Sequence, residues 1–245
     1  MDQSTNKKEI EKFAKLSYDW WNLNGKFSAL HRINPLRIKF ILDIVYKHFN
    51  INAFHKNPLS DLKILDIGCG GGLAREQIAK LGGLVHGIDA DKEAIKIAKQ
   101  HSKNVGLDIL YENKSIENLE LSDESKYDVI FVLELIEHVD NPSDLLKKID
   151  PYLKENGLIF VSSINKNIRS LLLAKIAAEY LLAWVPKGTH DWQKFIEPNK
   201  LNSHMKKLNY IHFTSKGIIF DPIKMLWKLS DDLSVNYISC FKKIY

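Results

Sequence analysis

The sequence of 245 residues contains only two cysteines, Cys69 and Cys240, and no apolar run long enough to cross a membrane. Two cysteines cannot build a disulfide framework or a four-thiolate zinc site, which favours a reducing compartment. The first residues are polar and lack the apolar core of a secretion signal. Thirty-five basic and thirty acidic residues leave a mild, dispersed net charge of +5, so we expect no nucleic-acid partner. The composition predicts a cytoplasmic globular protein.

Short apolar runs alternate with helix patterns through the middle of the chain. The runs cover 63–67, 84–88, 127–132 and 158–162, and the helix patterns cover 73–81, 92–104 and 143–153. This alternation predicts an α/β fold in which helices cover both faces of a parallel sheet. We expect residues 1–50 to form a helical N-terminal extension before a main domain at 51–245. Residues 163–195 follow the end of a strand, where an insertion is expected to form a lid beside the ligand crevice.

The most specific motif is the loop at 65–72, Leu-Asp-Ile-Gly-Cys-Gly-Gly-Gly, between a predicted strand and a predicted helix. Gly68, Gly70 and Gly72 let the backbone turn tightly and approach a ligand, and the helix that follows offers free N–H groups. A dinucleotide fingerprint is excluded because Leu73 stands where its third glycine belongs. A P-loop is excluded because no Gly-Lys-Ser/Thr ends the run.

An acidic residue, Asp89, ends the next predicted strand seventeen residues beyond the last loop glycine. A carboxylate at this position can accept both hydroxyls of a ribose. The D-x-G-x-G-x-G pattern that begins at Asp66, together with Asp89, resembles class I S-adenosylmethionine-dependent methyltransferases. The resemblance implies that the loop binds the methionine portion of the cofactor and Asp89 the ribose. It also places Ser115 and Ile116 near the adenine and Leu133 in the pocket lining.

Three polar residues follow the third apolar run: Glu134, Glu137 and His138. If this turn is helical, their spacing puts them on one face. Two carboxylates and an imidazole could ligate a divalent ion, with the oxygens favouring Mg²⁺ and the histidine admitting Zn²⁺ or Mn²⁺. Alternatively, His138 or a glutamate takes a proton from a substrate hydroxyl. In a third interpretation Glu134 caps a turn and His138 packs as a structural residue.

Further segments resemble the ubiquinone-biosynthesis O-methyltransferase family, namely 31–37 (His-Arg-Ile-Asn-Pro-Leu-Arg), 134–139, 185–191 and 235–237. The similarity runs from about residue 9 to 240. It implies a Rossmann-like sheet of seven strands and an enzyme that O-methylates polyprenylated catechol and demethylubiquinol intermediates. It also implies that Arg37 contacts the cofactor and that Glu134, Glu137 and His138 bind a metal. The alternatives are a methyltransferase of another small phenol or quinone, and a non-catalytic, membrane-docked subunit of the same fold.

The segment from Asn167 to Pro186 is predicted to bind membrane surfaces reversibly. Its broad apolar face, flanked by basic residues, includes Leu172, Ile176, Leu181 and Trp184. A helix of this kind can lie among acyl chains with its basic ends near anionic headgroups, although the same face could instead pack on the sheet. Because a polyprenyl substrate resides in the bilayer, we expect peripheral attachment to the inner face of the membrane. Other ubiquinone-biosynthesis proteins are expected partners there.

Overall fold

The computed structural model describes residues 7–122, 126–167, 194–221 and 223–244. Most of the predicted lid at 163–195 therefore lies outside the described residues, and so do all four predicted membrane-contact residues, Leu172, Ile176, Leu181 and Trp184. Within the described part of the chain, no helix is long and apolar enough to cross a membrane.

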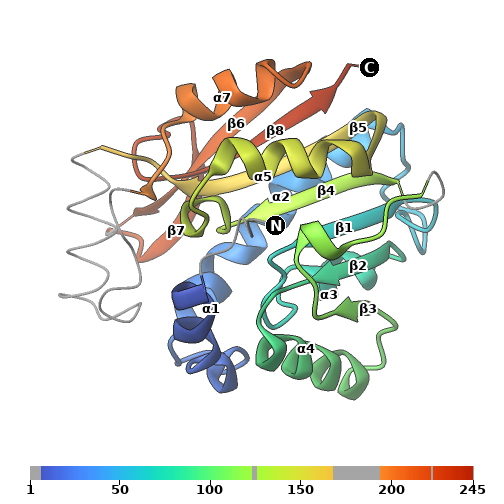
Figure 1. Cartoon of the computed structure of the whole chain (residues 1–245), viewed down its shortest axis with the longest axis vertical. Coiled ribbons are helices and arrows are strands. Elements are labelled where there is room, and N and C mark those ends of the chain that lie inside the picture. Colours follow the sequence, from blue (N-terminus) through green and yellow to red (C-terminus); the bar gives the residue numbers. More distant parts are fainter. Residues whose placement is uncertain (1–6, 123–125, 168–193, 222, 245) are drawn as a thin grey trace.

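A central sheet organises the molecule (Figure 1). In the described part of the chain it has eight strands in the order β3-β2-β1-β4-β5-β8-β6-β7. The strands are β1 Lys63–Ile67, β2 Leu84–Ile88, β3 Leu110–Glu112, β4 Tyr127–Leu133, β5 Leu153–Ile164, β6 Tyr210–Asp221, β7 Leu226–Ser230 and β8 Asn236–Lys243. Strands β1 to β5 pair in parallel, whereas β8, β6 and β7 join the sheet antiparallel. The predicted α/β fold is confirmed.

The strand count differs from the predicted seven because β7 adds an edge strand that forms a hairpin with β6. An edge strand pairs on one side only and keeps many side chains exposed. None of the five residues of β7 is buried: Leu226 and Lys228 are exposed and the other three are partly exposed. No buried apolar run therefore marked this strand in the sequence.

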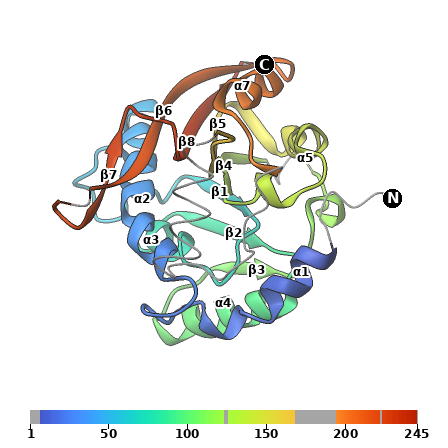
Figure 2. The same ribbon diagram turned by 90° about the vertical axis from the view of Figure 1, so that its left-hand side faces the viewer.

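Helices cover both faces of the sheet (Figures 1 and 2). They are α1 Lys7–Ala14, α2 Ser28–His48, α3 Arg75–Ala79, α4 Lys92–Asn104, α5 Pro142–Ile149 and α7 Pro198–Lys206. Neighbouring residues of a strand point to opposite faces. Accordingly, Ile64 packs in one core cluster with α2, α3 and α4, while Leu65 packs in a second cluster with α5 and α7. Burial on both faces explains why these strands read as continuous apolar runs.

The N-terminal segment, from α1 to the start of α2, is fastened to the carboxyl edge of the parallel strands. Helix α1 lies beside α4 (Figure 2). Three hydrogen bonds tie the segment down: Ser17 Oγ donates to Asp91 Oδ2 at 2.6 Å, Trp21 Nε1 to the Gly71 carbonyl at 2.9 Å, and Asn34 Nδ2 to the Leu73 carbonyl at 3.2 Å. The extension is therefore packed against the loop predicted to bind the cofactor.

Candidate active site

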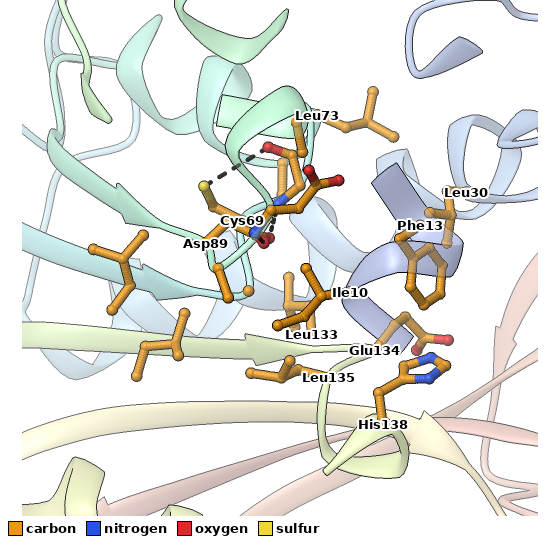
Figure 3. A pocket seen from close by; sticks show the side chains of 18 of the residues that line it. Ile10, Phe13, Leu30, Cys69, Leu73, Asp89, Leu133, Glu134, Leu135 and His138 are labelled. Atoms are coloured by element: carbon orange, nitrogen blue, oxygen red, sulfur yellow. Dashed lines mark hydrogen bonds between the residues drawn. The ribbon is translucent and has the colours of Figure 1, made fainter. Parts of the chain in front are cut away.

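A pocket opens at the carboxyl ends of β1, β2 and β4, between the glycine loop and the N-terminal segment. Figure 3 shows Cys69 and Asp89 at one end of it and Phe13, Glu134 and His138 at the other. The carboxyl edge of an open α/β sheet is where such folds bind their ligands. The two ends differ in chemistry and are described in turn.

The glycine loop turns at positions that only glycine adopts without strain. Gly68, Gly70 and Gly72 have φ angles of 73°, 50° and 93°, in the left-handed region. A Cβ on Gly68 would lie 2.8 Å from Leu135 Cδ1, and a Cβ on Gly70 would overlap the Trp20 indole. Gly68 and Gly70 line the pocket, and their missing side chains let Leu135 and Trp20 approach the loop backbone closely.

The remaining loop residues of the predicted cofactor set support the loop from behind. Gly72 faces the Tyr111 hydroxyl, and Asp66 is fully buried; neither is in the pocket lining. The Asp66 carboxylate forms an ion pair with Arg75, which also donates to the Cys69 carbonyl. Burial raises the pKa of Asp66 to about 6, although the neighbouring Arg75 opposes the shift. Arg75 thereby joins the strand end to the turn of the loop.

Asp89 lies at the mouth of the loop and lines the pocket. Its Oδ2 accepts a hydrogen bond from the Gly70 N–H at 2.6 Å, and its Oδ1 accepts one from the Asp91 N–H at 2.8 Å. Burial raises the pKa of this carboxyl above its ordinary value. The N-cap of α4 is a different residue, Asp91, which accepts from the Glu93 N–H at 2.9 Å. Asp89 is therefore not used as a helix cap.

Several buried polar atoms of the pocket lining have no hydrogen-bond partner among the described residues, and two of them lie in side chains that are otherwise apolar or uncharged. These two atoms are Ser115 Oγ, beside the buried Ile116, and Trp20 Nε1. Leaving a buried donor or acceptor unpaired is costly, so two such groups in one pocket indicate a polar ligand. The Trp20 ring is held by stacking on Phe27, with centroids 3.9 Å apart. The glycine loop, Asp89 and these two groups fit S-adenosylmethionine.

The other end of the pocket begins where β4 ends at Leu133, which lines the pocket as predicted. Glu134 follows with a φ of 53°. Its Oε1 lies 2.5 Å from Arg37 Nη2 and accepts from Ser162 Oγ at 2.8 Å. Arg37, from α2, is buried and also lines the pocket. A charge that would be costly to bury alone is thus neutralised at the pocket wall.

Glu137 and His138 lie in the short 3-10 turn Ile136–His138. Glu137 is buried and accepts from Ser163 Oγ at 3.1 Å. Burial, with the charge of Glu134 as a second cause, raises the pKa of Glu137 to about 8. The His138 ring meets the Phe13 ring edge to face, with centroids 5.0 Å apart. Helix α1 thus touches the imidazole directly.

Known proteins share this chain's sequence almost end to end. The methyltransferase domain family matches residues 58–217. The ubiquinone biosynthesis O-methyltransferase of Pelagibacter ubique is 45% identical over 240 residues, which cover 98% of this chain and 99% of the relative. The chain belongs to the ubiquinone biosynthesis O-methyltransferase family. The Rickettsia felis member is 40% identical over 237 residues, covering 97% of this chain and 93% of the relative.

Solved structures share the fold of this family member. The magnesium protoporphyrin IX methyltransferase of Synechocystis PCC 6803 with bound S-adenosylhomocysteine aligns with a TM-score of 0.66 at 14% identity. The alignment covers 97% of this chain and 95% of that one. A plantazolicin methyltransferase complex aligns with a TM-score of 0.65 at 18% identity and covers 97% and 98% of the two chains. At these identities the likeness shows the class I S-adenosylmethionine-dependent methyltransferase fold alone.

The side chains predicted to bind a metal are not arranged as a metal site. Among the described residues, no three His, Cys, Asp or Glu side chains are grouped to hold an ion. The predicted common face requires a helical turn, but Glu134 is left-handed and precedes the 3-10 turn that holds Glu137 and His138. Glu134 is instead bound to Arg37 and Ser162. The residues as arranged do not fit a metal.

Sequence reasoning missed several residues of this site. Trp20 and Phe13 reach the pocket from the N-terminal segment, and Arg75 supports the loop from within α3. A lone arginine in a short helix carries no pattern that singles it out. The adjacent tryptophans at 20 and 21 were a usable signal, because two large neighbouring rings in a polar segment indicate a contact or binding surface.

Proposed function

We propose that this protein transfers the methyl group of S-adenosylmethionine to a phenolic oxygen of polyprenylated catechol and demethylubiquinol intermediates of ubiquinone biosynthesis. The carrying observation is the position of His138, which lines the same pocket as the glycine loop but stands at its opposite end. Apolar side chains of Ile10, Phe13 and Leu135 also line this part of the pocket. An apolar wall beside a base suits an aromatic acceptor, and the names of the relatives support the choice of substrate.

The chemistry requires removal of one proton. A phenol has a pKa of about 10, so its oxygen becomes a strong nucleophile at neutral pH only when a base takes the proton. When bound, S-adenosylmethionine supplies an electrophilic methyl group on a sulfonium. The His138 ring accepts the phenolic proton while the oxygen–carbon bond forms and the carbon–sulfur bond breaks. Asp89, Ser115 and Trp20 hold the donor, so most of the remaining acceleration comes from orienting two reactants and excluding water.

A methyl-transfer assay with labelled S-adenosylmethionine and both short-prenyl acceptors tests this function. We expect the wild type to methylate the catechol and the demethylubiquinol. His138→Gln should lower kcat by about a hundredfold or more while binding of S-adenosylhomocysteine stays unchanged. His55→Gln, at an exposed position in the loop before β1, is the matched control and should keep the full rate. An inactive wild type would favour the non-catalytic subunit. A fully active His138→Gln variant would show that His138 is not the general base.

A divalent ion at Glu134, Glu137 and His138 is the alternative that the family resemblance implies. It requires Glu134 to exchange Arg37 for the ion. We expect exhaustive chelation to leave the rate unchanged, because His138 alone can take the proton. If chelation abolishes the activity and Mg²⁺ restores it, the ion has a catalytic role and Glu134 must change partners.

Attachment to the inner face of the membrane also belongs to this proposal. The apolar face of the segment 167–186 and its flanking basic residues support it. We expect the wild type to co-sediment with anionic vesicles, and the double variant Leu172→Glu with Trp184→Glu to stay in the supernatant while folded. Contacts with other ubiquinone-biosynthesis proteins would follow from a shared membrane surface.

A further inference from the structure

The hairpin of β6 and β7 carries large apolar side chains into solvent at its tip. Ile223 is 92% exposed, Met225 73% and Leu226 44%. Exposing such side chains together forgoes the stabilisation that burial gives, and clustered exposed apolar residues mark interaction sites. We propose that this hairpin tip inserts into the membrane surface as a second contact that strengthens binding by the segment 167–186; the proposal rests on the proposed function, which requires a substrate in the bilayer.

The strand register places the hairpin tip beyond the carboxyl edge of the parallel strands. Asn236, the first residue of β8, pairs with Ile164 at the carboxyl end of β5 and with Ile218 in β6. Residues 219–221 of β6 continue past this point and pair with β7 alone. The hairpin therefore projects beyond the edge at which Asp89 and Glu134 line the pocket, and Figure 2 shows it reaching away from the body of the molecule.

The chain also enters its predicted membrane-binding segment at this edge. Asn165 donates its N–H to the Val235 carbonyl at 2.8 Å, and Asn167 Nδ2 donates to the Ser234 carbonyl at 2.6 Å. Both acceptors lie in the turn that connects β7 to β8. The last described residues before the segment are thus bonded next to the base of the hairpin, so both contacts would meet one membrane plane.

The charges near the tip suit anionic headgroups. Residues 223–228 contain Lys224 and Lys228 and no acidic residue. Lys228 binds Asp221 at 2.9 Å, whereas the Lys224 ammonium has no ion-pair partner among the described residues. Behind the tip, Trp227 packs on Phe220 with ring centroids 5.4 Å apart. Exposed apolar side chains, a lysine beside them and a tryptophan behind them are the residue types found at a membrane–water interface.

A bilayer fits this surface better than a protein partner does. A stable protein interface buries on the order of 800 Å² on each side, and the side chains at a narrow, convex turn offer only a small part of that. A lipid surface needs no complementary groove, because acyl chains rearrange around an inserted side chain. The tip has the shape and polarity of an insertion loop.

Co-sedimentation of the full chain with vesicles of phosphatidylcholine and phosphatidylglycerol tests the hairpin. The double variant Ile223→Ser with Met225→Ser should bind at least about tenfold more weakly than the wild type, since two exposed apolar side chains lose their burial in lipid. The matched control is Phe54→Ser. Phe54 is 98% exposed but precedes β1, at the opposite edge of the sheet, and its variant should bind like the wild type. Lys224→Glu should weaken binding to these vesicles more than to phosphatidylcholine alone.

Methyl-transfer rates distinguish a failure of the hairpin proposal from a failure of the proposed function. With a short-prenyl acceptor in solution, the double variant should keep the wild-type rate, because the hairpin lies outside the pocket lining. With a long-prenyl acceptor carried in vesicles it should be slower. Equal vesicle binding by the double variant and the wild type overturns the proposal, as does a wild type that binds no vesicles. A protein that binds vesicles through the hairpin yet methylates nothing would disprove only the proposed function.

Discussion

The two ends of the pocket are built in different ways. At the cofactor end, residues close in sequence hold one another: Asp89 accepts from Gly70, and Arg75 bridges Asp66 and the loop. At the acceptor end, the contacts join distant segments, as when Phe13 of α1 meets His138 or Arg37 of α2 meets Glu134. The first end has a local framework, to which the N-terminal segment adds Trp20, whereas the second is formed by side chains from distant segments. Binding of the donor and positioning of the acceptor should therefore respond separately to mutation.

The largest effect is expected at Asp89. Asp89→Ala removes two charge-assisted hydrogen bonds to ribose, each contributing about 1.5–3 kcal/mol, so affinity for S-adenosylhomocysteine should fall by on the order of a hundredfold or more. Isothermal calorimetry on the folded variant measures this. His138→Gln should leave the same affinity intact, which keeps the two ends distinct. Unchanged affinity in Asp89→Ala would contradict the assignment of the cofactor end.

Arg75 should be the residue on which the stability of the cofactor end depends most. Arg75→Met leaves the fully buried Asp66 carboxylate without its partner, and breaking a buried pair from one side costs about 3–5 kcal/mol. Urea unfolding at neutral pH measures the loss. The double variant Asp66→Asn with Arg75→Met should recover much of it, because no uncompensated charge remains. A loss below about 1 kcal/mol in Arg75→Met would show that the pair does not hold the loop.

The residues predicted for the cofactor end lie close together in the structure, because the physical requirements of that end are local. A left-handed turn favours glycine, and an acidic residue directly after a predicted strand, such as Asp89, can be recognised from the sequence. Ser115, Ile116 and Leu133 came from the family resemblance and do line the pocket. The acceptor end was predicted less well, since nothing in the local sequence says that Arg37 will neutralise Glu134. The predicted helical face is not formed for the same reason. Glu134 has a left-handed backbone, so it does not share a helical face with Glu137 and His138.

The buried Asp66 carboxyl predicts that the free energy of unfolding depends on pH. Its pKa is raised from 3.8 to about 6 in the folded protein, so the folded state binds this proton more tightly than the unfolded state does. The resulting stability is fully present below about pH 4 and is lost as the pH rises through 6, by about 3 kcal/mol. The double variant Asp66→Asn with Arg75→Met should lack this slope. Parallel urea titrations from pH 4 to 7 that give both proteins the same slope would contradict the shift.

The smallest effect is expected at Trp20, which tests how the N-terminal segment contributes to the cofactor end. Its ring lies against Gly70 and Gly71, and its buried Nε1 has no partner within the described residues. The resemblance assigns this loop to the methionine portion, whose carboxylate would accept the indole N–H. Trp20→Phe keeps an aromatic ring against the loop and stacked on Phe27 but removes the donor.

Affinity for S-adenosylhomocysteine should therefore fall by on the order of tenfold to a hundredfold in Trp20→Phe, since a hydrogen bond to a charged group contributes about 1.5–3 kcal/mol. Affinity for 5′-methylthioadenosine, which lacks the amino acid portion, should not change. Trp21→Phe is the matched control: it loses a bond from Nε1 to the Gly71 carbonyl that belongs to the protein alone, so both ligands should weaken by the same small factor. If Trp20→Phe also weakens both ligands equally, the indole only packs on the loop and does not bind the methionine carboxylate.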